Sequence, residues 1–459
     1  MRRSSQRNPV KKVLLSGIPL LLGGFLRAEP LSLEHFVRGV LDRHPGLSAA
    51  DAGRRVAQAQ LAEARAQRLP RLTAFSQLTR GDGPVYAFAS LLDRRSFTAS
   101  DFAVDALNRP GYATHLRSSL ALGVPLFAGF AIQSQERLAA LGVEKAAWEE
   151  EQARQSLRRA VLEGALQQML ARQMESSLAA RIEAAEEEIA SAQKLRAKGL
   201  VLGSDYFAAE AVLSSLRAQR LEARERRAGA GETLALLRGD AVSPVEIAGS
   251  LEASPPSLPS EEAMRRALAD RPDLAALDRG ALQAATAARQ AGRFPWPTVD
   301  ALAEAQSNTD DFSSNAGQRL LMLRAQWALG DPARGARERR STALASAARR
   351  GREALAEQAE IEWRRALRAR SAAVAVSSEL DRTVEQAQKS LELFRPLYRE
   401  GRQSILDLVK AEQALADAEK ARAEARHALW WSHVQVLAAA GLLEDKNIAA
   451  LGGGLESRP

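Results

Sequence analysis

Apolar residues recur at intervals of three and four along two long stretches of the chain that are almost free of proline. Residues 126–243 contain no proline, and residues 333–458 contain only Pro396. Ala, Glu, Arg, Leu and Gln dominate both stretches, and all five favour helices. We expect one helix over residues 131–196, about 100 Å long at 1.5 Å per residue, and a second over residues 333–399. The heptad-like seam of the first helix comprises Leu166, Met169, Met174, Leu178, Ile182, Ala185 and Ile189.

Each long helix is followed by signals for a tight reversal of the chain. Gly199 and Gly401 suit a left-handed cap at the end of a helix. Ser204 and Ser404 then follow, and serine is a favoured N-cap for the returning helix. The sequence therefore predicts two long antiparallel helical hairpins. Shorter helices are expected before them, over residues 33–43, 45–68, 261–270 and 272–292.

Strict alternation of apolar and polar residues marks two further segments as strands. Residues 115–127 and 319–329 alternate, and residues 69–78 and 294–306 do so more weakly. Each pair of strands encloses a polar segment rich in Gly and Asn. One face of the first alternating segment carries Leu116, Ser118, Leu120, Leu122, Val124 and Leu126.

The two halves of the chain repeat one another, which indicates one structural unit used twice. Residues 41–47 read LDRHPGL and residues 268–274 read LADRPDL, and the segment 199–205 matches 401–407 in a second register. The first copy has extra residues in its middle. We expect the following organisation: a first repeat over residues 29–240, a linker rich in Pro and Ser over 241–259, a second repeat over 260–443 and a C-terminal tail over 444–459.

Composition limits the chemistry of the chain. The formal charge is +8 over 459 residues, but acidic and basic residues interleave along helical stretches such as 220–227, which indicates a solvated face and no nucleic-acid partner. The chain has no cysteine, so disulfides, thiolate metal sites and an acylated N-terminal cysteine are excluded. The five histidines are scattered and there is no phosphate-binding glycine loop, so we expect no catalytic residues, no cofactor and no bound metal.

The N-terminus resembles a signal peptide. Arg2, Arg3, Arg7, Lys11 and Lys12 precede an apolar run over residues 13–26 that is too short to span a membrane comfortably. We expect residues 1–28 to be removed after Ala28. The alternative is a buried N-terminal strand.

The alternating segments are typical of an outer-membrane barrel, with a soluble half-buried hairpin as the alternative. Four strands per chain cannot close a barrel, and open strand edges are not tolerated in lipid. If the strands lie in a membrane, several chains must share one barrel, and three chains would supply twelve strands. The fold class expected is mostly α with a small membrane β-barrel: four strands per chain, a barrel completed by trimerisation, and long helical hairpins that form a tunnel.

Several short motifs follow one another in a fixed order that is partly duplicated. They are Leu33–Glu34, His44–Leu47, Leu69–Leu72, Val124–Gly129 and the two glycine-to-aspartate tips at 199–205 and 401–407. Their order resembles that of the TolC-like outer-membrane efflux proteins over nearly all of the chain after residue 28. The resemblance implies a homotrimer with its barrel in outer-membrane lipid and its helices in the periplasm, working as a passive duct with a periplasmic adaptor and an inner-membrane pump.

The resemblance also implies a gate at the periplasmic tips. Asp407 falls on the position of a ring aspartate, and three such carboxylates near a three-fold axis would repel anions. The family's next acidic position is Lys410 here, and its usual arginine position is Gln403, with Arg402 beside it. The gate residues implied are Asp205, Tyr398, Arg402, Gln403, Asp407 and Lys410. A first-turn carboxylate favoured by the helix dipole is the alternative for Asp205, and ordinary packing is the alternative for Tyr398.

A small apolar cluster at the hairpin ends is the second candidate site. Such a cluster has little structural reason to be exposed unless it meets a partner, here the adaptor, although internal closure of the tips is the alternative. The residues are Leu195, Gly199, Leu200, Val201 and Ser204 on the first tip, and Leu397, Gly401, Ser404 and Ile405 on the second.

Two other classes of function compete with the channel. A periplasmic coiled-coil scaffold or adaptor without a barrel would explain the heptads and the leader, but not the alternating segments. An enzyme has no supporting motif.

Overall fold

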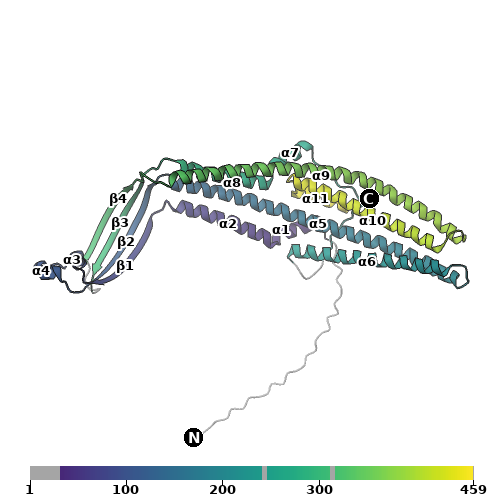
Figure 1. Ribbon diagram of the computed structural model, residues 1–459, viewed down its shortest axis with the longest axis horizontal. Helices are drawn as coiled ribbons and strands as arrows, with labels where there is room; N and C mark the ends of the chain where they lie inside the picture. Colours follow the sequence, from purple (N-terminus) through teal and green to yellow (C-terminus); the bar gives the residue numbers. More distant parts are fainter. Residues whose placement is uncertain (1–30, 240–244, 311–315, 458–459) are drawn as a thin grey trace, which may run out of the picture.

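The chain forms an elongated body with a four-stranded sheet at one end and two helical tips at the other (Figure 1). The computed structural model describes residues 31–239, 245–310 and 316–457. The expected signal peptide, residues 1–28, lies outside the described residues. Among the helices of these described segments, none is apolar over a sufficient length to cross a membrane.

Two long hairpins run most of the length of the body. In the first, α5 returns through α6; in the second, α9 returns through α10. The expected seam of α5 is buried, with Ala185 completely inaccessible and Met174 6% exposed. Both long helices confirm the prediction from proline placement. Their bounds are Ala131–Arg196 for α5, Gly203–Arg238 for α6, Arg334–Arg399 for α9 and Ile405–Ala439 for α10.

Shorter helices extend the returning helices toward the sheet. Helix α2 packs on α5, and α8 packs between α5 and α9. Nearer the tips, α6 lies against α5, and α10 lies against both α5 and α9. Four helices therefore pack side by side near the sheet (α2, α5, α8 and α9), and four pack near the tips (α6, α5, α10 and α9). The short helices are α1 (Leu33–Arg43), α2 (Pro45–Ala66), α7 (Glu261–Ala269) and α8 (Pro272–Gly292).

The four strands form one antiparallel sheet in sequence order, β1-β2-β3-β4. The register pairs Leu72 with Leu122 and Ala303 with Leu321, with an irregularity between Pro125 and Phe127. Both outer edges, β1 and β4, are unpaired within the described part of the chain. The strands are β1 (Arg71–Gly81), β2 (Ala113–Ala128), β3 (Thr298–Thr309) and β4 (Ala316–Gln326).

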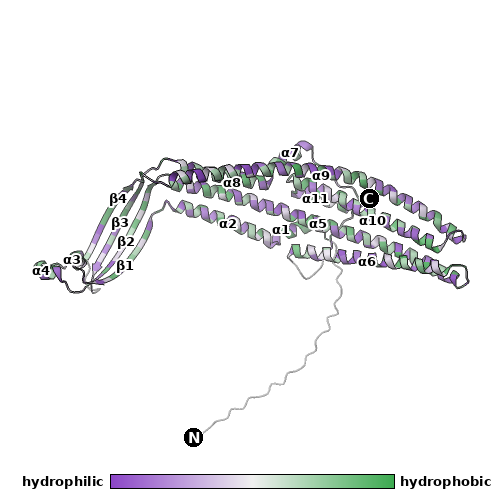
Figure 2. Cartoon of the chain, in the orientation of Figure 1, coloured by the Kyte–Doolittle hydropathy of each residue, from purple (hydrophilic) through white to green (hydrophobic). Residues whose placement is uncertain are grey.

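The register divides the sheet into an apolar face and a polar face, because directly opposed residues share a side. On the apolar face Leu321 and Leu323 are 85% and 69% exposed. The green segments of the strands in Figure 2 alternate with purple ones. The apolar face carries Leu72, Leu78, Leu116, Leu120, Leu122, Val124, Ala301, Ala303, Leu321 and Leu323; the polar face carries Arg71, Gln77, Arg117, Asp300, Glu304, Asn308, Gln318 and Arg324.

The extra residues of the first repeat form a small cap beyond the sheet. They contain α3 (Pro84–Asp93), the 3₁₀ turn η1 (Ala99–Phe102) and α4 (Val104–Asn108). Three phenylalanines, Phe88, Phe97 and Phe102, contact one another in the cap with ring centroids 4.9–6.2 Å apart. Arg94 forms an ion pair with Asp310, which follows β3. This segment was expected to be a polar loop, but it contains short helices and an aromatic cluster.

The main hydrophobic core lies midway along the body, where both repeats and the C-terminus meet. Trp363 and Trp430 are its largest side chains, at 1% and 0% exposure. The described part of the linker belongs to this core, since Ile247 is completely buried and its amide donates to Gln168 at 2.9 Å. A second core fills the space between the hairpins nearer the tips.

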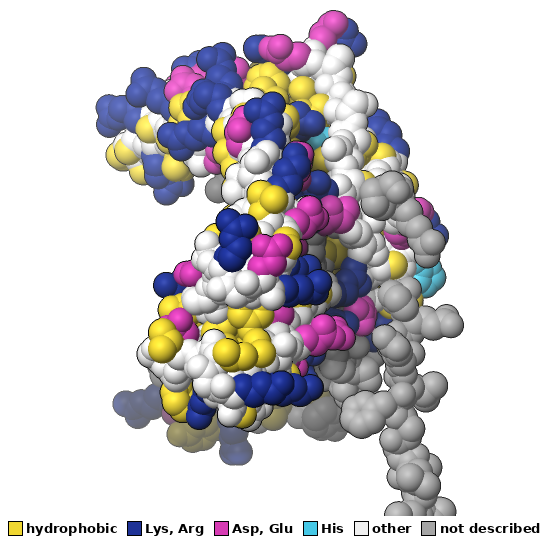
Figure 3. All heavy atoms as spheres, turned by 90° about the vertical axis from the view of Figure 1, so that its right-hand side faces the viewer, with side chains coloured by type: hydrophobic (Ala, Val, Ile, Leu, Met, Phe, Trp, Pro, Cys, Tyr) yellow, Lys and Arg dark blue, Asp and Glu magenta, His cyan; other side chains and the backbone are white. Residues whose placement is uncertain are grey.

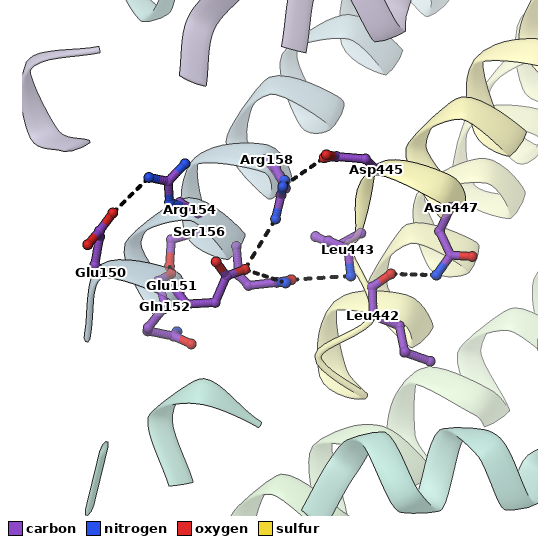
Figure 4. Close-up of polar contacts among 11 residues, drawn as sticks. Glu150, Glu151, Gln152, Arg154, Ser156, Arg158, Leu442, Leu443, Asp445 and Asn447 are labelled. Carbon is purple, nitrogen blue, oxygen red and sulfur yellow. Dashed lines mark hydrogen bonds and ion pairs between the residues drawn. The ribbon is translucent and has the colours of Figure 1, made fainter. Parts of the chain in front are cut away.

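The C-terminal segment forms a helix, α11 (Asp445–Glu456), which the glycine run Gly452–Gly454 had concealed in the sequence. A Cβ added to Gly454 would lie 3.0 Å from the ring of Trp430, so a small residue allows the close approach. Figure 4 shows Arg158 of α5 between Glu151 and Asp445, with N–O distances of 3.2 and 2.7 Å. These contacts fix α11 on the long helix.

Candidate functional site at the helical tips

Both hairpin tips use the same backbone motif to reverse the chain. The amide of Leu200 donates to the carbonyl of Leu195 at 3.1 Å, and the amide of Arg402 donates to Leu397 at 2.9 Å. The intervening glycines, Gly199 and Gly401, have φ of 74° and 71°. This is the Schellman arrangement, in which the left-handed residue is usually glycine. The tips confirm the reversal that the two glycines predicted.

The returning helices begin differently in the two repeats. Ser404 caps α10, because its Oγ accepts from the amide of Asp407 at 3.1 Å and lies 3.0 Å from the Asp407 carboxylate. The N-cap expected at Ser204 is wrong: α6 begins at Gly203, its N-cap is Leu202, and no side chain caps it. Ser204 lies in the first turn, where its hydroxyl donates to Asp205 at 3.3 Å. The extended backbone of Leu202 allows the helix to start two residues earlier than expected.

Figure 3 views the molecule from the end that carries the tips, where hydrophobic and charged side chains both reach the surface. Leu200 is 71% exposed, whereas Leu195 and Val201 are half-buried. At the second tip Leu397 and Ser404 are half-buried, and Ile405 is 1% exposed. Ile405 therefore closes the tip internally and does not offer a surface to a partner.

Two exposed apolar residues near the first tip were missing from the candidates selected on sequence. Leu202 and Phe207 are 69% and 63% exposed. The guanidinium of Arg196 lies 4.9 Å from the centre of the Phe207 ring and 4.7 Å from that of Tyr206. Cation–π contact of this kind holds an aromatic side chain in place at the surface. Leu202 directly follows Val201, and this was the available signal in the sequence.

The six candidate gate residues form no shared network within the described part of one chain. Arg402 pairs with Glu400 at 3.5 Å, and Asp407 is engaged with Ser404. Lys410 is exposed, and Gln403 and Asp205 are partly exposed. The Tyr398 hydroxyl is buried and has no hydrogen-bond partner in the described residues. Burial, followed by the charge of Glu188, raises the pKa of Tyr398, so its O–H is a protonated donor available to an acceptor.

A buried ionic cluster behind the tips was missed by the sequence analysis. Glu412 of α10 is 0% exposed and lies 2.6 Å from Arg395 of α9 and 3.4 Å from Arg181 of α5. Arg395 is also 3.3 Å from Glu188 of α5. Carboxylates on these helices were interpreted as solvated; Glu412 is an exception because it faces the inner side of α10. The cluster joins the second hairpin to the long helix of the first.

Glu188 has the most strongly raised pKa of this cluster. Burial and the neighbouring Glu412 raise its pKa to about 7, and Arg395 only partly offsets them. Arg395 is shared between two carboxylates and lies closer to Glu412, at 2.6 Å against 3.3 Å. Glu188 is therefore the carboxylate of this cluster that titrates near neutral pH.

Aromatic residues collect at the opposite end of the helices, where the sheet begins. Phe130 and Trp296 have ring centroids 6.1 Å apart, and the chain of edge-to-face contacts continues through Phe294 to Trp327. Trp296 and Trp327 are about half exposed, at 52% and 51%. Rings of this type at one edge of an apolar surface are typical of a membrane–water interface.

The described residues contain no group of three or more potential metal ligands among His, Asp and Glu. No constellation of nucleophile, base and oxyanion donors lies near the tips. The arrangement at the tips is suited to contact with a partner protein and to closing the end of the helical body.

Comparison with known proteins gives a match to one family model over part of the chain and a shared fold over most of it. Residues 37–240 match the family model described as outer membrane efflux protein. Comparison with the curated proteins gives no match.

Solved structures share the fold over most of the chain. The CmeC outer membrane channel of Campylobacter jejuni is 18% identical with a TM-score of 0.76, covering 93% of this chain and 87% of its own. The outer membrane protein VceC of Vibrio cholerae is 19% identical with a TM-score of 0.73, covering 89% and 96%. The open state of the Neisseria gonorrhoeae MtrE outer membrane channel is 19% identical with a TM-score of 0.74, covering 90% and 89%.

Proposed function

We propose that three copies of this chain form the outer-membrane duct of a tripartite export system, because residues 37–240 match the outer membrane efflux protein model and the fold matches that of solved outer-membrane channels. The family sets the localisation: the sheet lies in the outer membrane and the helices form a tunnel in the periplasm. The resemblance expected from the sequence motifs is thereby confirmed.

The two-faced sheet with open edges is the observation that carries the proposal. An apolar face with leucines up to 85% exposed has no covering element among the described residues, and lipid would cover it. The free edges of β1 and β4 would be unsatisfied in lipid unless β4 of one copy pairs with β1 of the next. Three copies give a closed barrel of twelve strands with its polar face inward.

The ends of the strands support this placement. The aromatic cluster of Phe130, Phe294, Trp296 and Trp327 would lie at the periplasmic surface of the membrane. β1 and β4 each have 11 residues, against about 9–11 for a tilted membrane strand. The cap containing α3 and α4 would then lie outside the cell.

We assign the tips to gating and to the adaptor. Asp205, Tyr398, Arg402, Gln403, Asp407 and Lys410 are the proposed gate residues. Exposed Leu200, together with Leu202 and Phe207, gives the adaptor an apolar surface. The inner-membrane pump would deliver the cargo, and this chain would supply a passive conduit with no catalytic residue. We also propose that the chain is organised as the two repeats, the linker and the C-terminal segment that the sequence predicts.

A periplasmic scaffold is the alternative from another class, and the exposed apolar sheet argues against it. Single-channel recording in planar bilayers separates the two. Discrete conductance steps from purified wild-type protein are expected of the duct. A preparation that stays soluble without detergent and never conducts would favour the scaffold.

A further inference from the structure

A cavity of about 730 Å³ lies where the polar face of the sheet meets the helices. Its walls come from the end of α2, the start of β1, the C-terminal part of β2 and the start of α5. Residues of β3 and β4 complete it. Arg71, Gly123, Leu302 and Met322 line it and share one face of the sheet, since the register pairs Arg71 with Gly123 and Leu302 with both Gly123 and Met322. Such a volume is within the range of about 300–1,000 Å³ that holds small organic ligands.

The cavity combines an apolar wall with one uncompensated positive charge. Leu302, Met322 and Ile132 supply apolar surface. Of the arginines on the polar face, Arg324 pairs with Asp300 at 3.3 Å and Arg117 with Glu304 at 3.7 Å. Arg71 makes no ion pair with any residue that the structure describes, and the residue opposite it, Gly123, has no side chain to cover it.

Closure of the barrel would leave this charge uncompensated. Arg71 lies on β1, the edge strand that would pair with β4 of the neighbouring copy. β4 (Ala316–Gln326) contains no Asp or Glu, and it carries two arginines of its own. The trimer would therefore have three unpaired arginines at one level of its inner wall, each beside an apolar cavity.

We propose that this cavity is a cargo-binding site that takes amphipathic organic anions, with the anionic group on Arg71 and the apolar body on Leu302, Met322 and Ile132. The inference rests on the proposed duct, because only a closed barrel makes the polar face an inner wall. It adds a class of cargo that the passive tunnel alone does not specify.

Block of single-channel current by two short amphiphiles of opposite charge tests the site. Octane-1-sulfonate should block wild-type channels at lower concentration than octylammonium, and ethanesulfonate should block weakly because it lacks the apolar body. In Arg71→Gln the half-blocking concentration of octane-1-sulfonate should rise about tenfold, as expected for the loss of one charged hydrogen bond. Arg71→Lys should keep most of the block.

Arg117→Gln is the matched control, since it removes the same charge from the same face about 20 Å away, six residues along the sheet. Its block should stay within twofold of wild type. Conducting wild-type channels that do not prefer the sulfonate, or equal block in Arg71→Gln and Arg117→Gln, would overturn the binding site and leave the duct intact. Absence of any conducting channel would overturn both.

Discussion

Arg395 on α9 and Glu412 on α10 form an ion pair 2.6 Å long, and the side chain of Glu412 has no exposed surface. The pair closes the second hairpin behind its tip. Through Glu188 and Arg181 it also reaches α5 of the first hairpin. These charges therefore act together with the second hydrophobic core to hold the two hairpins against each other near the tips.

Removing Arg395 should destabilise this region. In Arg395→Met, Glu412 keeps only Arg181 as a partner at 3.4 Å, and loss of one charged hydrogen bond should cost about 1.5–3 kcal/mol. Thermal unfolding followed by circular dichroism should show a lower Tm. Arg382→Met, which removes an exposed arginine of the same helix paired with Glu379, is the control and should leave the Tm almost unchanged. Equal Tm values for both variants would contradict the assigned role.

Glu188 should make stability depend on pH near neutrality. Burial raises its pKa in the folded protein to about 7, from an ordinary value of 4.5. The folded state therefore binds the proton more tightly, and its contribution to stability is present below pH 4.5 and is lost as the pH rises through about 7. The Tm of wild type should fall between pH 5 and pH 8 by more than that of Glu188→Gln, which cannot titrate. Parallel curves for the two proteins would refute this assignment.

Neighbouring leucines on β4 test which face of the sheet meets lipid. Leu321 is 85% exposed on the apolar face, while Leu320 is 49% exposed on the polar face. Arginine at the lipid-facing position near mid-membrane should cost about 2–4 kcal/mol. Leu321→Arg should reduce the amount of assembled protein in the outer membrane, and Leu320→Arg should be tolerated. The opposite order of effects would reverse the assignment of the faces.

The tip glycines can be tested with the backbone strain held constant. Their positive φ makes any L-residue costly, about 1–2 kcal/mol, and no atom lies within 4 Å of a Cβ added at Gly199 or Gly401. Ala and Glu therefore share the strain but differ in what they present to a partner. Gly199→Glu and Gly401→Glu should abolish transport while the trimer stays in the outer membrane, and the alanine variants should retain transport. Normal transport in both glutamate variants would eliminate the tips as the docking site.

Regular periodicity allowed much of the fold to be predicted. The bounds of α5 matched the expectation because helix-forming residues without proline continue almost to Gly199, and the alternating leucines of β2 located one of the two central strands. α11 was missed because Gly452–Gly454 disfavour a helix, and burial against Trp430 overrides that preference.

The candidate site was harder to predict for a physical reason. Glu412 belongs to a helix rich in charges, and only its position relative to α5 and α9 shows that it is buried. The unpaired state of Arg71 likewise depends on strand register, which places Gly123 opposite it and the acidic side chains of β3 beside other arginines. Local sequence patterns contain neither relationship.

Membrane fractionation followed by the native mass of the detergent-extracted protein tests the central claim most directly. The account predicts outer-membrane protein with three times the mass of one chain, because four strands per copy close a barrel only when three copies share it. A soluble periplasmic monomer or dimer would contradict the duct, and with it the assignment of the gate, the adaptor surface and the cargo site.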